Sequence, residues 1–392
     1  MEAPSFALIP SGFKSQKVYS VIPESGVGDL LFDRSNNTAT RTNKDGLIES
    51  VAADIPRLNY EVTNGVVDSC PHLLLEMNST NLVTYSEDFT QWATSGVTIT
   101  ANSSTSPDGK LNASLFSHSG GSFPQIALSG ITFVNGANYA PSLYVKSDGT
   151  SQVQHSLIVN GQVVNFTPTN EWVRITDTIV SPDTSGSFVI AQNSGSAVAA
   201  SFLIFGAQLE ESSYATSYIP TSGSAQTRAS ESCTRAGDVN TFNSVEGILY
   251  AELKRDIATD TGFRRVVIDN ANNNLENTVR LGYSTVTDEI KGVVTVGGAT
   301  QCALVFAGLS VTSFRKMALL YKVNQFELWV DGSKRAEDTS GSTFPINTLN
   351  NLSFEQANGS DKLRAKVKDV RYYDTDGMSN TEITNLLTQL TQ

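Results

Sequence analysis

The chain has 392 residues and a formal net charge of −12, with 39% hydrophobic but only 17% charged residues. At roughly 150 residues per domain, this length predicts two or three domains, and the hydrophobic content excludes a disordered chain. Apolar runs stay below the roughly 18 residues of a membrane span, so we expect no membrane insertion. The acidic balance argues against nucleic-acid binding, which needs clustered Lys and Arg. The first residues lack a basic segment followed by an apolar one, so we also expect no signal peptide.

Residues 1–80 differ from the rest of the chain in having only short apolar stretches between turn formers. Breaks occur at Gly26, Gly28, Pro56 and Asn64-Gly65. These stretches contain too few periodic apolar residues for a core of their own. We therefore expect residues 1–80 to form an extended arm that is ordered by packing on a partner or within an oligomer.

Residues 81–222 show strand-length segments separated by turns. Val, Ile and aromatic residues are frequent in segments 139–145, 155–159, 172–179, 187–191 and 201–209. Asn160-Gly161 joins two such segments and is a strong signal for a two-residue hairpin turn. Strands at this spacing, with no helical segments between them, predict a β-sandwich of jelly-roll type.

The segment from residue 216 to 231 is rich in Ser, Thr, Gly and Pro, and we interpret residues 223–232 as a linker. Residues 233–392 repeat the pattern of short strands, most clearly at 317–322 and 326–330 around a turn at Asn324. A helix follows at the end of the chain. Ser379 and Glu382 have capping-box spacing, and four apolar residues follow at helical period: Ile383, Leu386, Leu387 and Leu390. The predicted fold is all-β, with two tandem antiparallel sandwiches after the arm and one short C-terminal helix.

The sequence contains no persuasive catalytic or metal-binding pattern. Three scattered cysteines and three scattered histidines offer neither a zinc motif nor a hydrolytic triad. A glycosidase needs two carboxylates on either side of the scissile bond. Adjacent pairs such as Glu210-Glu211 point to opposite faces of a strand, so we interpret them as solvated charges. We predict a protein that is not an enzyme and uses no cofactor or metal.

Two features are candidates for ligand binding. Trp92, Trp172 and Trp329 could each stack on a sugar ring, although a role in the core is the alternative for each. We single out Trp329 and Glu327 as candidate glycan-binding residues, because they share a strand face opposite Phe326, Leu328 and Val330. The alternative is that this face is covered by the terminal helix or by another subunit. The second feature is a row of basic residues that alternation predicts on one strand face: Lys362, Arg364, Lys366 and Lys368. We interpret this row either as a patch that binds an anionic ligand or partner, or as the solvated face of an edge or outer strand.

Three stretches resemble the head spike fibre and related fibre proteins of tailed bacteriophages. The first covers residues 39–49 and 55–60, the second covers Cys70-Pro-His-Leu-Leu-Leu-Glu76 and residues 80–92, and the third covers Gly206-Ala-Gln-Leu-Glu210, residues 214–221 and Thr227-Arg228. In that family the stretches frame a carbohydrate-binding-like jelly roll, which here spans residues 81–222. Residues 233–392 are similar to laminin-G and concanavalin-A-like sandwiches, through residues 321–332, 367–373 and 379–382. This second resemblance implies a fold and gives no ligand.

The resemblances imply a structural virion appendage, a head fibre or spike, whose lectin-like domains bind host-surface glycans. They imply that residues 1–80 attach to the capsid or another virion protein, and that the protein is a dimer or trimer on the virion surface, made in the cytoplasm of the host bacterium. Three alternatives remain open: a tail fibre, a purely structural capsid decoration protein, and a depolymerase that cleaves polysaccharide.

Overall fold

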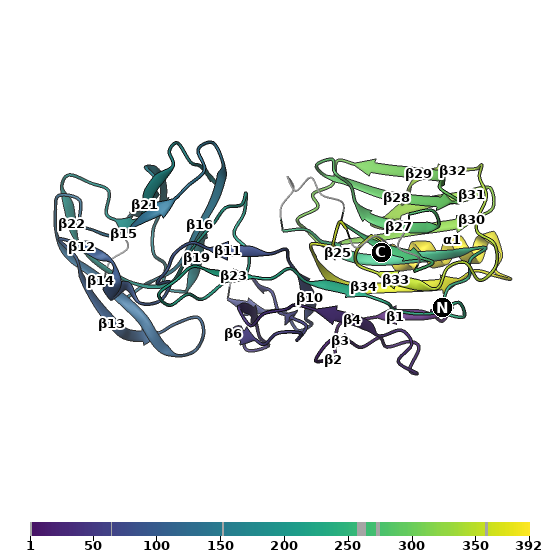
Figure 1. Cartoon of the computed structure of the whole chain (residues 1–392), viewed down its shortest axis with the longest axis horizontal. Coiled ribbons are helices and arrows are strands. Elements are labelled where there is room, and N and C mark those ends of the chain that lie inside the picture. The colour runs from purple at the N-terminus through teal and green to yellow at the C-terminus, as the bar shows by residue number, and fades with distance from the viewer. Residues whose placement is uncertain (1, 64, 151–152, 257–263, 272–274, 357–359) are drawn as a thin grey trace.

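The computed structural model forms two β lobes joined by the N-terminal part of the chain (Figure 1). It describes residues 2–63, 65–150, 153–256, 264–271, 275–356 and 360–392. Within these ranges the chain is nearly all-β, with one α-helix and one short 3₁₀ turn, Phe89–Gln91. This confirms the predicted fold class. The helix of the described ranges is too short and too polar to cross a membrane.

The first lobe is a sandwich of two antiparallel sheets. One sheet has the order β13 (Thr98–Thr105), β14 (Leu111–Gly121), β22 (Ala197–Glu210), β16 (Asn138–Ser147) and β19 (Val173–Thr176), with β20 (Ile179–Val180) also paired to β16. The other has the order β12 (Ala93–Ser95), β15 (Gln125–Thr132), β21 (Ser185–Ala191), β17 (His155–Val159) and β18 (Gln162–Phe166). Inward-facing side chains such as Phe116, Leu143 and Ile190 form the core between them.

The predicted hairpin turn of this lobe is confirmed. Asn160 and Gly161 lie between β17 and β18, with φ angles of 47° and 80°. Two successive positive φ angles define the turn type whose twist matches that of paired strands, and Asn and Gly adopt it at least cost.

The second lobe is a larger sandwich that includes strands from the N-terminal segment. Its first sheet has the order β32 (Ser333–Asp338), β31 (Gln325–Val330), β30 (Arg315–Lys322), β25 (Gly247–Lys254), β34 (Ala365–Asp374), β10 (His72–Leu75) and β7 (Leu58–Asn59), with β1 (Phe6–Leu8) also paired to β34. Its second sheet has the order β29 (Ala299–Ala307), β28 (Glu289–Val296), β27 (Thr278–Tyr283), β26 (Arg264–Asp269) and β33 (Asn351–Ser353).

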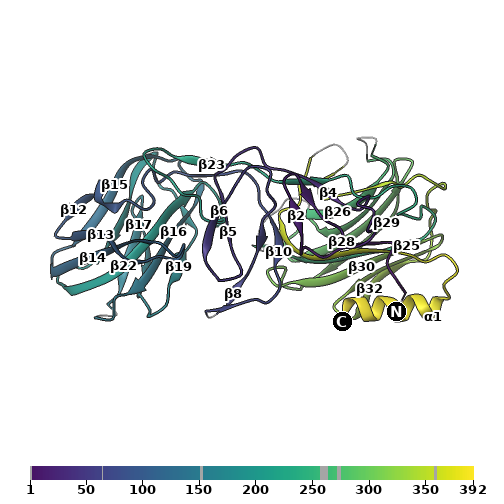
Figure 2. The same ribbon diagram turned by 90° about the horizontal axis from the view of Figure 1, so that it is seen from below.

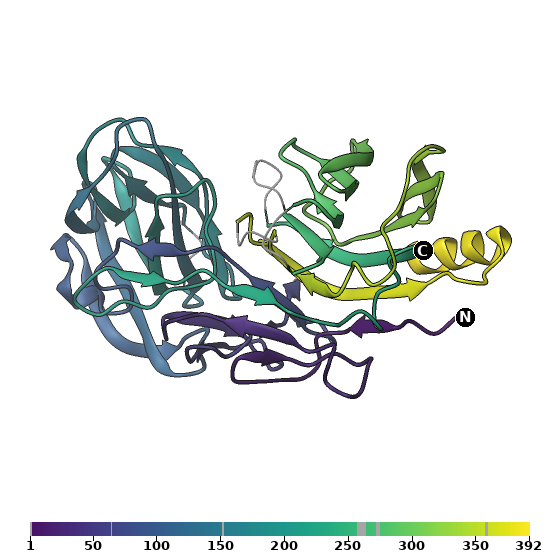
Figure 3. The same ribbon diagram turned by 45° about the vertical axis from the view of Figure 1, so that its right-hand side comes forward.

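The structure contradicts the prediction that residues 1–80 form an extended arm packed on a partner or within an oligomer, because several of these residues pack within the same chain. Phe6, Leu8, Leu73 and Leu75 are fully buried in the core of the second lobe of the same chain. Their apolar stretches are too short to build a core, but each is long enough to add one strand to a sheet that already exists. Figure 3 shows the purple N-terminal segments lying along the underside of the second lobe and below the region where the two lobes meet. The second lobe is thus not confined to residues 233–392.

Four small sheets complete the N-terminal segment and the connections between the lobes. They are β2 (Phe13–Lys14), β3 (Lys17–Val18), β4 (Leu30–Asp33) and β24 (Ser232–Thr234) in one sheet; β5 (Ala39–Thr42) with β6 (Ile48–Val51); β8 (Val62–Thr63) with β9 (Val66–Val67); and β11 (Ser79–Asn81) with β23 (Gln226–Arg228). In Figure 2, β5, β6 and β8 lie between the two lobes. The segment predicted as a linker, 223–232, contributes to two of these sheets, and it contains the buried residues Arg228 and Glu231.

The C-terminal helix α1 (Asn380–Thr391) covers the outer face of the larger sheet (Figure 2). Ser379 caps it through a complete capping box with Glu382, as the sequence predicts. Ile383 and Leu387 pack with Ile248, Leu320 and Trp329 in a second, smaller apolar cluster.

We expect a fragment of residues 233–392 to aggregate, or to melt more than about 10 °C below the second lobe of the full chain. Without residues 1–80, β34 loses its partners β1 and β10, and the core loses several large side chains, each contributing about 1.5–3 kcal/mol. Differential scanning calorimetry of fragment and full chain tests this. An unchanged melting temperature would contradict the shared core.

Candidate functional site

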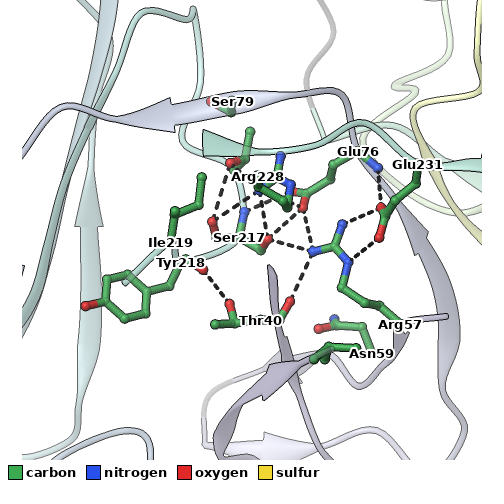
Figure 4. Close-up of polar contacts among 12 residues, drawn as sticks. Thr40, Arg57, Asn59, Glu76, Ser79, Ser217, Tyr218, Ile219, Arg228 and Glu231 are labelled. Atoms are coloured by element: carbon green, nitrogen blue, oxygen red, sulfur yellow. Dashed lines mark hydrogen bonds and ion pairs between the residues drawn. The ribbon is translucent and has the colours of Figure 1, made fainter. Parts of the chain in front are cut away.

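A buried network of Arg and Glu side chains forms the junction between the lobes (Figure 4). The guanidinium of Arg57 donates through Nε to Glu231 at 2.7 Å, and its Nη1 lies 2.8 Å from a carboxylate oxygen of Glu76. Arg34 pairs with Glu231 at 3.0 Å, and Arg228 pairs with Glu76 at 3.2 Å. All five side chains are buried. Such charges are stable in a protein interior only when each one is paired.

Further hydrogen bonds connect this network to the jelly-roll lobe. Ser217 donates its backbone N–H at 2.8 Å and its hydroxyl at 2.6 Å to the Glu76 carboxylate. Arg57 also donates to the carbonyl oxygen of Thr40 at 3.0 Å. Burial by itself would raise the pKa of Glu76, but Arg228 and Arg57 outweigh it and hold that pKa far below its usual range.

Five of the junction residues come from the stretches that resemble phage fibre proteins, whereas Arg34 and Glu231 lie outside those stretches. Thr40 and Arg57 belong to the first stretch, Glu76 to the second, and Ser217 and Arg228 to the third. The three stretches are far apart in the sequence but meet at one place in the structure. The three stretches therefore supply most of the residues of the junction.

A groove lies beside this junction, between the two lobes. We call it the interlobe groove; its volume is about 900 Å³, and a polar recess of about 180 Å³ shares part of its lining. The residues that line both groove and recess are Thr42, Ile48, Asn59, Tyr144, Arg174 and Lys366. A preformed groove of this size, with aromatic and polar lining, is suited to a small ligand or a few sugar units.

One wall of the groove presents two aromatic rings and a guanidinium on the jelly-roll sheet. Tyr144 on β16 lies opposite Arg174 on β19, and the guanidinium carbon of Arg174 lies 5.5 Å from the centre of the Tyr144 ring. Trp172 precedes Arg174 by two residues and also lines the groove, half-buried, with its indole N–H donated to the carbonyl oxygen of Thr105 at 3.1 Å. That hydrogen bond fixes the orientation of the indole ring.

Gly206 explains how Tyr144 reaches this position. The pairing of β16 with β22 shifts register between Ser142 and Tyr144, and Gly206 on β22 has a φ angle of 64°. A Cβ atom at Gly206 would lie 3.2 Å from ring carbons of both Tyr144 and Tyr218. Only glycine combines this backbone conformation with the space for two rings.

The opposite wall is built from paired charges of the N-terminal segment and the second lobe. Glu61 accepts hydrogen bonds from Lys254 at 2.7 Å and Lys366 at 2.9 Å, and Lys366 also contacts Asp256 at 3.1 Å. Burial would raise the pKa of Glu61, but the two ammonium groups lower it to about 2. The Glu61 carboxylate is therefore ionised at neutral pH.

The structure places the sequence-predicted residues Trp329 and Glu327 in a covered position. Trp329 is 7% exposed and packs beneath helix α1, and its indole N–H donates to Glu327 at 2.8 Å. A sugar platform needs an accessible ring face, which Trp329 does not offer. Trp92 is also buried, in the core of the first lobe. Of the three tryptophans, Trp172 is the one that borders a groove.

The basic row of the second lobe is only partly in a strand, since Lys362 and Arg364 precede β34, and that strand is not at the edge of its sheet. Strand β34, which carries Lys366 and Lys368, lies between β25 and β10 in the larger sheet. Lys366 faces the interlobe groove, while Lys368 contacts Asp68 at 3.6 Å and lies over the ring of Phe314. Glu210, interpreted from sequence as a solvated charge, is fully buried and accepts hydrogen bonds from Thr216, Ser79 and Gln208.

Comparison with protein-family models gives no match for this chain, and comparison with curated proteins gives none either. Among solved structures, the Ruminococcus gnavus IT-sialidase CBM40 bound to α2,3-sialyllactose is 14% identical over 38% of this chain and 83% of that chain, with a TM-score of 0.31. The CBM22-1–CBM22-2 tandem domain of Paenibacillus barcinonensis Xyn10C is 11% identical over 76% of this chain and 99% of that chain, with a TM-score of 0.26. Likenesses this distant decide neither ligand nor activity.

We expect Arg57→Ala to lower the free energy of unfolding by about 3–5 kcal/mol, because it leaves the buried carboxylates of Glu231 and Glu76 without a main partner. Urea denaturation measures this. The matched control is Lys44→Ala, which removes a solvent-exposed pair with Asp45 and should change the stability little. Equal effects of the two substitutions would contradict a central role for the junction.

We expect the protein to lose stability as the pH falls from about 5 towards 2. The pKa of Glu61, about 2 in the folded protein, is below the ordinary value of about 4.3 for an unfolded chain, so its ion pairs stabilise the fold fully above that value and progressively less below it. Glu76 acts in the same direction. Melting temperatures at several pH values test this, and Glu61→Gln should flatten the profile. A wild-type profile that stays level down to pH 3 would contradict the assignment.

Proposed function

We propose that this protein is a bacteriophage virion appendage that binds a host-surface glycan in the interlobe groove without cleaving it. The observation that carries the proposal is the wall formed by Trp172, Arg174 and Tyr144. A pyranose ring has one apolar face and a rim of hydroxyl groups. The ring of Trp172 suits the apolar face, and the surrounding guanidinium, hydroxyl and carboxylate groups suit the rim.

The opposite wall supports binding over hydrolysis. A glycosidase requires one carboxyl group that keeps its proton near neutral pH, which means a raised pKa. In the groove, the pKa of Glu61 has the reverse shift because two lysines hold the carboxylate ionised, and Asp256 of the adjoining recess is paired with Lys366. These carboxylates are suited to accept hydrogen bonds from sugar hydroxyls.

The assignment to a virion rests on the resemblance of the three sequence stretches. Their convergence on the buried junction supports it, since residues of all three stretches then meet in one structural unit. A fibre carries many copies, so weak individual sites would combine into useful avidity for a cell surface. Because residues 6–8 and 72–75 are strands of the second lobe, attachment to the capsid or another virion protein would use the outer surface of the N-terminal segment.

We expect Trp172→Ala to abolish binding to the preferred glycan on a glycan array while lowering the melting temperature by only a few degrees, because the ring is half-buried at the groove wall. The matched control is Trp329→Ala. It should destabilise the second lobe by about 3–5 kcal/mol, since it opens a cavity under helix α1, yet preserve binding by the molecules that remain folded. Binding that survives Trp172→Ala would overturn this location of the site.

The virion assignment is tested separately. Antibody labelling of purified particles in the electron microscope should decorate the head or the tail, and sedimentation of the purified protein should show a dimer or trimer. Absence of the protein from the particles would overturn the assignment. Release of oligosaccharides from a host polysaccharide would identify a depolymerase instead.

A further inference from the structure

Arg174 differs from the other cations of the interlobe groove in having no carboxylate partner. The other two cations that line the groove, Lys254 and Lys366, both pair with Glu61, and Arg41 of the neighbouring recess pairs with Glu49 at 2.6 Å. Arg174 donates only to neutral oxygens, the carbonyl of Thr216 at 2.6 Å and the hydroxyl of Ser142 at 2.9 Å. No carboxylate of the described residues lies within ion-pair distance of its guanidinium. The positive charge of Arg174 is therefore not neutralised by the part of the chain that the structure describes.

The surroundings hold this charge at the lining of the groove. The guanidinium lies over the Tyr144 ring, and its two hydrogen bonds tie it to β16 and to the segment after β22. Those bonds occupy two of the five N–H groups of an arginine side chain, and a third, the Nε–H, is buried without a partner. The remaining N–H groups are on the two terminal nitrogens. An arginine held in place before the ligand arrives loses little conformational freedom on binding.

Trp172 lies two residues before Arg174, directly ahead of strand β19, and both side chains line the same groove. Two residues of extended chain span about 7 Å. A sugar ring stacked on Trp172 therefore places a substituent, or the next sugar of the chain, beside Arg174. An anionic group at that position would gain a charge-assisted hydrogen bond, which is stronger than a bond from a neutral hydroxyl.

We propose that the glycan bound in the interlobe groove is acidic, and that its carboxylate binds Arg174 while a neighbouring ring stacks on Trp172. This inference rests on the proposed glycan-binding function and narrows it to one chemical class. Glu171 also lines the groove and is exposed to solvent. Its negative charge opposes an acidic ligand, so removing it strengthens binding most at low ionic strength, where screening is weakest.

The test is a glycan array that presents acidic glycans, such as sialylated and uronic-acid oligosaccharides, beside the same glycans with their carboxyl groups reduced to alcohols. The full-length protein should bind the acidic member of a pair at least tenfold more tightly, and added salt should reduce that preference. Equal binding to both members would overturn the inference and leave the proposed function intact. Binding to no glycan would overturn both.

Variants assign the preference to one side chain. Arg174→Gln should remove the acidic preference, whereas Arg315→Gln, which removes a paired arginine of the second lobe outside the lining of the groove and the recess, should preserve it. Glu171→Gln should increase the affinity for acidic glycans. Melting temperatures show whether each variant is folded. A folded Arg174→Gln protein that keeps the tenfold preference would overturn the role of Arg174. If that variant does not fold, the comparison of acidic and reduced glycans with the wild-type protein still decides the inference.

Discussion

The pairing of Arg57 with Glu231 and Glu76 is the interaction on which the rest of the structure depends. Three guanidinium groups and two carboxylates are buried together, and they come from segments as far as 197 residues apart. Each would be costly to bury alone, so the segments that carry them must arrive together. The junction therefore fixes where the N-terminal segment leaves the second lobe and where the chain crosses to and from the jelly roll.

The interlobe groove follows from this constraint. Its aromatic wall belongs to the jelly roll, and its charged wall belongs to the N-terminal segment and the second lobe. Either lobe alone would present only half of the site. The proposed preference for an acidic glycan depends on the same arrangement, because Arg174 receives no carboxylate from the facing wall, where Glu61 is already paired with two lysines.

The N-terminal segment has a role that its composition conceals. Its apolar residues lie in short runs. The run around Leu73 pairs with the first part of strand β34, before Lys368, and the run around Phe6 pairs with the part after Lys368. Between these two runs, the segment contributes Arg34 and Arg57 to the junction and forms the hairpins β5–β6 and β8–β9 that border the groove. A region without a core of its own thus stabilises one lobe and shapes the site between two.

The sequence by itself determined the local features, because they depend on neighbouring residues. The all-β fold, the Asn160-Gly161 turn and the Ser379 cap follow from side chains within a few positions of one another. Tertiary structure decided which tryptophan borders a groove. Trp172 and Trp329 both occur in strand-like sequence, but helix α1 covers Trp329, and Trp172 faces a wall built from residues far away in the chain. It also decided that Arg57 and Glu231, 174 residues apart, would neutralise each other, since no local pattern records which distant charge a buried arginine will meet.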